Sequence, residues 1–249
     1  MLPYFSITQL SFGPIVIQVW GFWVALGFIL ALIISLREAR RRRIEEEIIW
    51  DFMIIALLGM ILGGRIFYLF FGSDENISAL ADLHSGFSLM GGAMVSGIFV
   101  FAYLKYKKQN ITQVFDLLTL GAITALIFTR IGCSLVGDHI GKITTLPWGR
   151  EFVDGTVRHP VALYEIFFLI IIFFIILDIK TKQKKEGALF VAFCFLYAFC
   201  RFFADFLRCE DMDFCDPHFW GFTATQWVLL FLIILLSFLY FSKLLKQNR

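Results

Sequence analysis

The chain has 249 residues, of which 59% are apolar and 17% are charged. Ordinary soluble domains are about 45–50% apolar and about 25% charged. Together with a mean hydropathy of +0.79, this composition excludes a water-soluble globular domain and predicts an integral membrane protein. The formal net charge of +2 comes from basic residues in short, separate clusters, so nothing indicates binding to nucleic acid.

Seven apolar stretches are long enough to cross a bilayer, which takes roughly 20 apolar residues. They lie at about 14–36, 48–71, 88–104, 112–136, 160–179, 187–207 and 222–242. The first stretch lacks a basic N-terminal region and a small-residue cleavage site, so we expect it to be a retained helix. The predicted fold class is an all-α polytopic membrane protein with seven transmembrane helices, forming one integral membrane domain over residues 1–249.

The basic residues predict the orientation of the chain. Lys and Arg cluster after the first, third, fifth and seventh apolar stretches, at 37–43, 105–108, 180–185 and 243–249. With seven crossings, all four clusters fall on one side of the membrane. The positive-inside rule makes that side the cytoplasm, so the N-terminus is predicted outside and the C-terminus inside.

Three arginines, Arg65, Arg130 and Arg201, lie inside apolar stretches. A charge at membrane depth costs at least about 2.5–3.5 kcal/mol, so such an arginine usually faces the bundle interior and binds something. The alternative for each is a snorkelling or helix-pairing side chain. Residues four apart share a helix face, which groups Tyr197, Arg201 and Asp205. An arginine held in this way is suited to a phosphate, and in a membrane the nearest phosphate is a phospholipid head group.

Polar residues gather at the outer ends of the predicted helices. Asp138 and His139 follow Arg130, and Arg208 follows Asp205. All four histidines fall in outer loops or outer helix ends, namely His84, His139, His159 and His218. We therefore expect the chemistry at the outer leaflet. The outer segments 73–87 and 138–159 are long enough to form arms over such a site.

Glycine and cysteine allow two interpretations each. The spacing of Gly59 and Gly63 is typical of close helix packing, whereas Gly91 and Gly92 at a helix start fit either packing or an anion-binding backbone. Cys209 and Cys215 lie in one outer segment, where a disulfide can persist but is not established by sequence. With His218 they supply too few ligands for zinc, so no metal or other cofactor is expected.

Four segments then resemble motifs of the prolipoprotein diacylglyceryl transferase family. Phe87 to Gly92 resembles Ser-Phe-His-Gly-Gly, and Arg130 to Gly141 resembles Gly-Arg-x-Gly-Asn-Phe-x-Asn-x-Glu-x-x-Gly. The third segment has two parts: Leu146 to Gly149 resembles Pro-Trp-Gly, and Arg158 to Glu165 resembles Arg-His-Pro-x-Gln-Leu-Tyr-Glu. The fourth, Tyr197 to Arg208, resembles Tyr-x-x-x-Arg-x-x-x-Glu-x-x-Arg. The four occur in order on the predicted outer side, and the similarity extends from the first helix through the sixth.

The resemblance implies transfer of a diacylglyceryl group from phosphatidylglycerol to the lipobox cysteine thiol of an exported precursor protein. The products are a thioether and glycerol phosphate, and the location is the bacterial cytoplasmic membrane. The substrate supplies the nucleophile, so the enzyme needs no catalytic cysteine. Fixed guanidinium groups would stabilise the charge that develops on the leaving phosphate.

The implied site residues follow from the matched motifs. Arg130 and Arg201 would stabilise the phosphate, Asp205 would orient Arg201, and Asp138 would orient Arg130 or bind the head group, with His139 as a candidate proton acceptor. The implied substrate-binding residues are Trp20, Arg65, Met90, Gly91, Gly92, Gly132, Cys133, Gly141, His159, Tyr197 and Arg208.

The chain also departs from these motifs. Met90 stands where the motif has histidine, and Cys133, Val136 and Ala162 replace hydrogen-bonding side chains. Two alternatives therefore remain open: a related transferase with another lipid donor or acceptor, and a catalytically silent paralogue that binds lipid or a partner protein.

Overall fold

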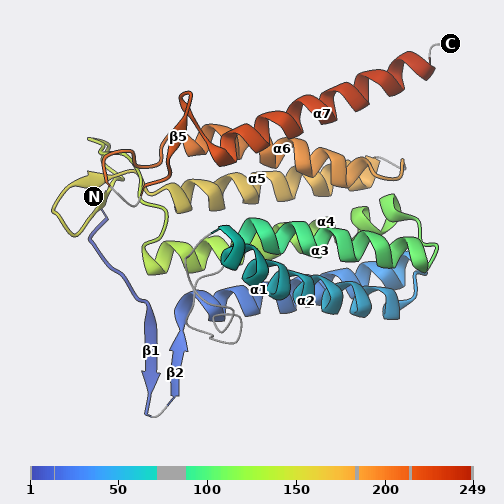
Figure 1. Cartoon of the computed structure of the whole chain (residues 1–249), viewed down its shortest axis with the longest axis horizontal. Coiled ribbons are helices and arrows are strands. Elements are labelled where there is room, and N and C mark those ends of the chain that lie inside the picture. The colour runs from blue at the N-terminus through green and yellow to red at the C-terminus, as the bar shows by residue number, and fades with distance from the viewer. Residues whose placement is uncertain (1, 14, 72–87, 183–184, 213–214, 248–249) are drawn as a thin grey trace. The chain divides into compact units, whose positions relative to one another are not determined.

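The computed structural model describes residues 2–13, 15–71, 88–182, 185–212 and 215–247. The described residues form seven helices (Figure 1): α1 (Val19–Arg42), α2 (Glu46–Phe71), α3 (Leu89–Tyr106), α4 (Ile111–Val136), α5 (Val161–Lys182), α6 (Ala188–Asp205) and α7 (Ala224–Gln247). Five of them, α1, α2, α4, α5 and α6, are long and apolar enough to cross a membrane. Shorter apolar runs lie in α3 and α7, at Gly91–Tyr106 and Ala224–Phe238. The predicted helices are present, and the architecture is that of a multi-pass membrane protein.

The prediction for the first apolar stretch is wrong at both ends. Residues before Val19 form an antiparallel hairpin of β1 (Gln9–Phe12) and β2 (Ile15–Gln18). Gly13 has a positive φ of 60° in the turn, and the β-branched Val16 and Ile17 favour an extended strand over a helix. At the other end, α1 continues to Arg42, because long basic side chains are good helix formers that apolarity alone does not detect.

Two further small sheets modify the all-helical expectation. Strands β3 (Arg150–Glu151) and β4 (Val157–Arg158) pair within the segment 138–159, and β5 (His218–Phe219) pairs with β6 (Phe222–Thr223) directly before α7. The segment 138–159 is therefore a folded excursion that carries a hairpin. The other predicted arm, 73–87, lies outside the described residues.

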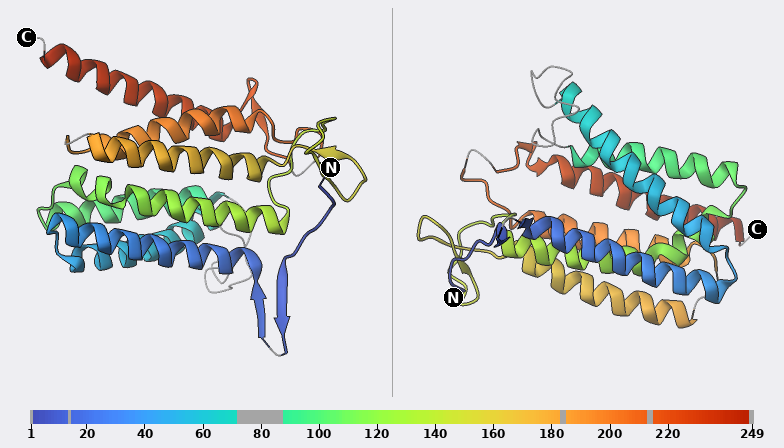
Figure 2. Two further views of the ribbon diagram at one scale, coloured as in Figure 1. Left: turned by 180° about the vertical axis from the view of Figure 1, so that it is seen from behind. Right: turned by 90° about the horizontal axis from the view of Figure 1, so that it is seen from below.

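The contacts divide the chain into two compact units, Met1–Ala31 with Leu118–Arg249, and Leu32–Leu117. Within the first unit, α6 packs against α5 on one side and α7 on the other (Figures 1 and 2). A stripe of α5 is buried at helical spacing and consists of Glu165, Leu169, Ile172 and Ile176. A carboxylate thus occupies the same inward face as three large apolar side chains.

The second unit is built on the packing of α3 against α2. A methyl group added to Gly59 would lie 2.6 Å from the Cα of Ser96, and one added to Gly63 would lie 2.5 Å from the Cβ of Val95. The two helix backbones therefore approach so closely that only glycine fits at these positions, which confirms the predicted role of this pair in helix packing.

Candidate active site

A buried carboxylate joins three helices in the first unit. Glu165 of α5 is 3% exposed. Its Oε2 lies 2.5 Å from the Nε of Arg130 in α4, and its Oε1 accepts a hydrogen bond from the Arg201 guanidinium in α6. Buried charges are tolerated when they are paired, so this single carboxylate allows two arginines to lie side by side inside the bundle.

The predicted polar face of α6 is present. Arg201 Nη2 lies 2.9 Å from Asp205 Oδ1, one helical turn away. The other Asp205 oxygen accepts a hydrogen bond of 2.9 Å from the hydroxyl of Thr223 in β6. Tyr197, one turn in the other direction, interacts with Arg130. The pairing of Arg201 with Asp205 that the spacing predicted is therefore confirmed, whereas Tyr197 interacts with α4.

His139 connects the buried arginines to the loop that follows α4. Gly137 and His139 both have positive φ, 88° and 61°, so the chain turns sharply where α4 ends. The Nε2 of His139 lies 2.6 Å from Arg130 Nη1, and its Nδ1 lies 3.1 Å from Arg208 Nη2. Burial, and then the neighbouring arginines, lower the pKa of His139 to about 3. The imidazole is therefore uncharged at neutral pH, so it can accept a hydrogen bond without adding a fourth positive charge.

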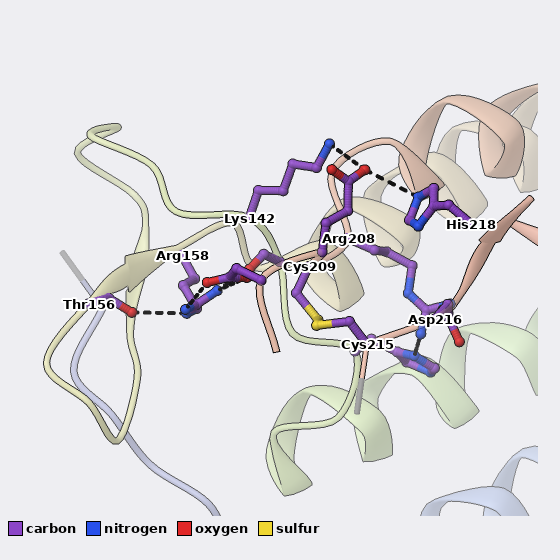
Figure 3. Close-up of a disulfide and its surroundings, with 12 residues drawn as sticks. Lys142, Thr156, Arg158, Arg208, Cys209, Cys215, Asp216 and His218 are labelled. Carbon is purple, nitrogen blue, oxygen red and sulfur yellow. Dashed lines mark hydrogen bonds and ion pairs between the residues drawn. A yellow bond between two sulfur atoms is a disulfide. The ribbon is translucent and has the colours of Figure 1, made fainter. Parts of the chain in front are cut away.

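Arg208 lies just beyond the end of α6 (Figure 3). Its side chain is 16% exposed, close to the 14% of Arg130 and above the 7% of Arg201. Its Nη1 is 2.5 Å from Asp216 Oδ2 and 3.8 Å from Asp205 Oδ1. The neighbouring residues Cys209 and Cys215 form a disulfide. The disulfide that the sequence left open is thus present, which excludes these two sulfurs as zinc ligands.

Two hollows are lined in part by the loop after α4. The larger has a volume of about 270 Å³ and is lined by Gly137, Asp138, His139, Ile140, Arg208, Cys209, Cys215 and Asp216. The other is also lined by residues 137–140, together with Arg150 and His159 among others. Asp138 is exposed and lines both hollows. The larger hollow therefore offers the guanidinium of Arg208, the imidazole of His139 and backbone groups to a ligand.

The remaining predicted residues of this unit have packing contacts. Cys133 is buried with its sulfur 3.9 Å from Arg130 Nη1. A side chain at Gly132 would contact Trp20 and Trp23 of α1, and one at Gly141 would collide with the backbone of His159. The Nδ1 of His159 lies 3.1 Å from the hydroxyl of Tyr164. Gly132 therefore lets α4 approach α1, and Gly141 lets the loop after α4 approach His159.

Four predicted site residues belong to the unit Leu32–Leu117 and are described within it alone. Arg65 is half-buried in α2. Side chains at Gly91 and Gly92 would collide with Phe67 and Met60, so both glycines pack α3 against α2. Their predicted binding role stays a prediction. Met90 lies in α3, and its side chain is outside the described part of the chain.

The sequence model for prolipoprotein diacylglyceryl transferase matches residues 7–242. The chain belongs to this family. Among curated relatives, the phosphatidylglycerol–prolipoprotein diacylglyceryl transferase of Clostridium tetani is 29% identical over 230 residues, covering 89% of this chain and 91% of the relative. The proteins of the same name from Clostridioides difficile and Campylobacter hominis are 32% identical over 197 residues and 30% identical over 262 residues. They cover 78% and 96% of this chain, and 79% and 93% of their own lengths.

The sequence prediction missed three residues of the charged cluster around Glu165 and His139 in this family member. Glu165 was seen only as part of a motif, although an acid in the apolar stretch 160–179 is as misplaced as an arginine. Weighing buried acids together with buried bases would have found it. Asp216 and Thr223 carried no such signal, because Asp216 lies in the polar segment before the last apolar stretch and Thr223 lies at the start of that stretch. They approach Arg208 and Asp205 only through the fold.

Proposed function

We propose that this protein transfers the diacylglyceryl group of phosphatidylglycerol to the lipobox cysteine thiol of a prolipoprotein. The proposal is supported by family membership over residues 7–242 and by relatives that carry this activity in their names. The single observation that carries it to a site is the cluster of Arg130, Arg201 and Arg208 around Glu165 and His139. A phosphate is the ligand that such guanidinium groups suit best.

The proposed setting is the bacterial cytoplasmic membrane, with seven crossings, the N-terminus outside and the C-terminus in the cytoplasm. The distribution of basic residues supports this orientation,. Arg130, Arg201 and His139 lie at the C-terminal ends of α4 and α6 or just beyond them. In this orientation those ends face outward, so the reaction takes place near the outer leaflet, where both an exported precursor and phosphatidylglycerol are present. The folded segment 138–159 then lies over the site as an arm.

The reaction requires one bond to form and one to break. The thiol sulfur attacks the terminal glyceryl carbon of the diacylglyceryl group, a carbon–sulfur bond forms, and the bond from that carbon to the phosphate oxygen breaks. The thiol proton leaves, and glycerol phosphate departs with an additional negative charge. Charge therefore develops on the phosphate as the bond breaks, and cations fixed before the reaction stabilise it most effectively in a site with little water.

Each charged residue has a role in this scheme. Arg130 and Arg201 bind the phosphate as its charge increases, and Glu165 holds both guanidinium groups in place. Asp205 orients Arg201. Arg208 binds the head group at the entrance, together with Asp138.

The proton needs little assistance. A thiol of pKa about 8.5 is roughly 3% ionised at pH 7, so a reaction without a general base costs only about 2 kcal/mol. A family member with Met90 in place of the motif histidine can therefore be active. His139 is neutral, and a phosphate bound beside it would offset the effect of the arginines on its pKa and make it a better proton acceptor.

The test is a direct assay of the purified full-length protein. It is incubated with vesicles containing phosphatidylglycerol labelled in the acyl chains and with a peptide that carries a lipobox cysteine. We expect a labelled thioether on the peptide, and none when the cysteine is replaced by alanine. Arg201→Gln should reduce transfer by at least about 100-fold, the scale of losing one preorganised group that stabilises developing charge.

The control is Arg40→Gln at the C-terminal end of α1, which removes an exposed arginine that donates hydrogen bonds to Glu46 and does not line either hollow. It should leave transfer within about threefold of the parent if fold is retained, because losing hydrogen bonds that fix local structure chiefly lowers stability. Folded protein that forms no thioether would overturn the proposal. A product formed from phosphatidylethanolamine and not from phosphatidylglycerol would assign a different donor.

A further inference from the structure

The segment between α6 and α7 places a covalent bond beside an ion pair. Arg208 directly precedes Cys209, and Asp216 directly follows Cys215 (Figure 3). The disulfide joins the two cysteines, and Arg208 Nη1 lies 2.5 Å from Asp216 Oδ2. The same cross-link that closes the loop therefore holds the carboxylate against the guanidinium.

Asp216 acts on a guanidinium that has two other partners. Nη2 of Arg208 lies 3.1 Å from Nδ1 of His139, and Nη1 lies 3.8 Å from Asp205 Oδ1. A guanidinium is a rigid planar fork, so a carboxylate beside one terminal nitrogen and an imidazole nitrogen beside the other define the direction of its plane. His139 in turn contacts Arg130. A continuous set of polar contacts thus runs from the disulfide loop to the buried arginines.

The hollow of about 270 Å³ has this set of contacts on its wall. Its lining includes His139, Arg208, Cys209, Cys215 and Asp216. The disulfide is therefore part of the wall and not a remote cross-link. A change in the position of Asp216 alters where the Arg208 guanidinium points within the hollow.

We propose that Asp216, held in place by the Cys209–Cys215 disulfide, is a positioning residue for Arg208 and sets the affinity of the hollow for the phosphate of the donor lipid. This inference rests on the proposed function. Closing a short loop reduces the conformations open to it, so the carboxylate stays at the guanidinium without help from a packed helix. Asp216 acts through Arg208 and does not contact the reacting atoms.

The same loop supplies a matched control. Asp211 forms two hydrogen bonds with Arg158, of 3.0 and 2.7 Å. Its side chain is 43% exposed, and that of Asp216 is 40% exposed. Asp211 is not part of the lining of the larger hollow. Asp211→Asn therefore removes a comparable ion pair of the same segment and leaves the contacts of Arg208 in place.

The experiment measures kcat and KM for phosphatidylglycerol in the transfer assay, using the full-length chain. We expect Asp216→Asn to raise KM roughly tenfold, as for loss of one charge-assisted contact, with kcat within about twofold, because binding in ground and transition states is weakened alike. Asp216→Glu keeps the charge and should recover most of the parental KM. Asp211→Asn should leave KM unchanged.

The disulfide is tested by a double-mutant comparison. The paired substitution Cys209→Ser and Cys215→Ser should raise KM by a factor similar to that of Asp216→Asn. Adding Asp216→Asn to it should have little further effect, because both changes release the same guanidinium. Independent, multiplying effects would overturn the link between the disulfide and Asp216. If the serine pair does not fold, the three aspartate variants still decide the role of Asp216.

Other outcomes contradict the positioning role directly. A lower KM for Asp216→Asn would mean that the carboxylate competes with the lipid phosphate, and equal losses for Asp211→Asn would mean that the loop is needed only for structure. An active parent protein with an unaffected Asp216→Asn variant overturns this inference alone. A folded parent that does not use phosphatidylglycerol overturns the proposed function, and this inference with it.

Discussion

Two helix pairs of this protein are joined by opposite means. Helices α5 and α6 meet through charge, with buried Glu165 bonded to Arg201. Helices α2 and α3 pack closely because glycines such as Gly59 and Gly63 have no side chain to separate the two backbones. Ion pairs inside a membrane protein are expensive unless every member is satisfied, whereas glycine contacts need only close backbones. We therefore expect the first pair to serve the proposed reaction, whereas the second sets the distance between its two helices.

The largest effect should come from breaking the charged pair. Glu165→Gln leaves Arg130 and Arg201 without their shared counter-ion, which should destabilise the protein by about 3–5 kcal/mol and abolish transfer. Thermal unfolding in detergent and the transfer assay measure the two effects. The control is Glu210→Gln, which removes exposed contacts with Lys142 and His218 and should change stability by no more than about 1 kcal/mol. Wild-type stability in Glu165→Gln would contradict the role of the carboxylate in holding the arginines.

A smaller effect is expected from crowding the glycine pair. Gly59→Ala brings a methyl group to 2.6 Å from the Cα of Ser96, so the helices must separate, at a cost of about 1–3 kcal/mol. Gly97→Ala is the matched control in α3, since a methyl group there meets nothing within 4 Å. It should be neutral or stabilising by up to about 1 kcal/mol. Equal shifts in unfolding temperature for the two variants would show that close packing at Gly59 is unimportant.

A pH-dependent effect, which is small near pH 6.5 and grows as the pH falls, concerns the uncharged imidazole at the edge of the charged cluster. The pKa of His139 is about 3 in the folded protein, against an ordinary value of 6.5. Between these values the unfolded chain binds more protons, so the free energy of unfolding falls as the pH decreases from about 6.5. One histidine contributes a slope of at most about 1.4 kcal/mol per pH unit.

Unfolding midpoints of the parent protein and of His139→Gln, measured from pH 7.5 to 4.5, test this dependence. As the pH falls below about 6.5, the free energy of unfolding of the parent should decrease more than that of the variant. A difference that does not vary over this range would contradict burial of a neutral imidazole between two arginines.

The sequence predicted the helices better than their ends. The length of the apolar stretches located all seven helices of the described chain. The hydrocarbon thickness sets a minimum length for a spanning helix, and few other folds require apolar stretches that long. Apolar length misplaced the start of α1, because apolar residues in the β1–β2 hairpin and in the helix have the same hydropathy. Strand or helix at such a boundary depends on turn geometry and β-branching, which a hydropathy pattern does not include.

The same distinction applies to the site. Arg201 and Asp205 could be paired from sequence because helical periodicity relates residues four apart. Glu165 lies 36 positions from Arg201, and no local period connects them.

By itself, the sequence determined the membrane class, the helices, the family motifs and the misplaced arginines, since each depends on composition or local spacing. Only the tertiary structure decided that Glu165 joins Arg130 to Arg201, that His139 lies between two guanidinium groups, and that a disulfide brings Asp216 to Arg208. The physical reason is that an ion pair can join residues that lie far apart in the sequence. Several carboxylates are available to each arginine along the chain, and the packing of helices and loops selects which one it meets.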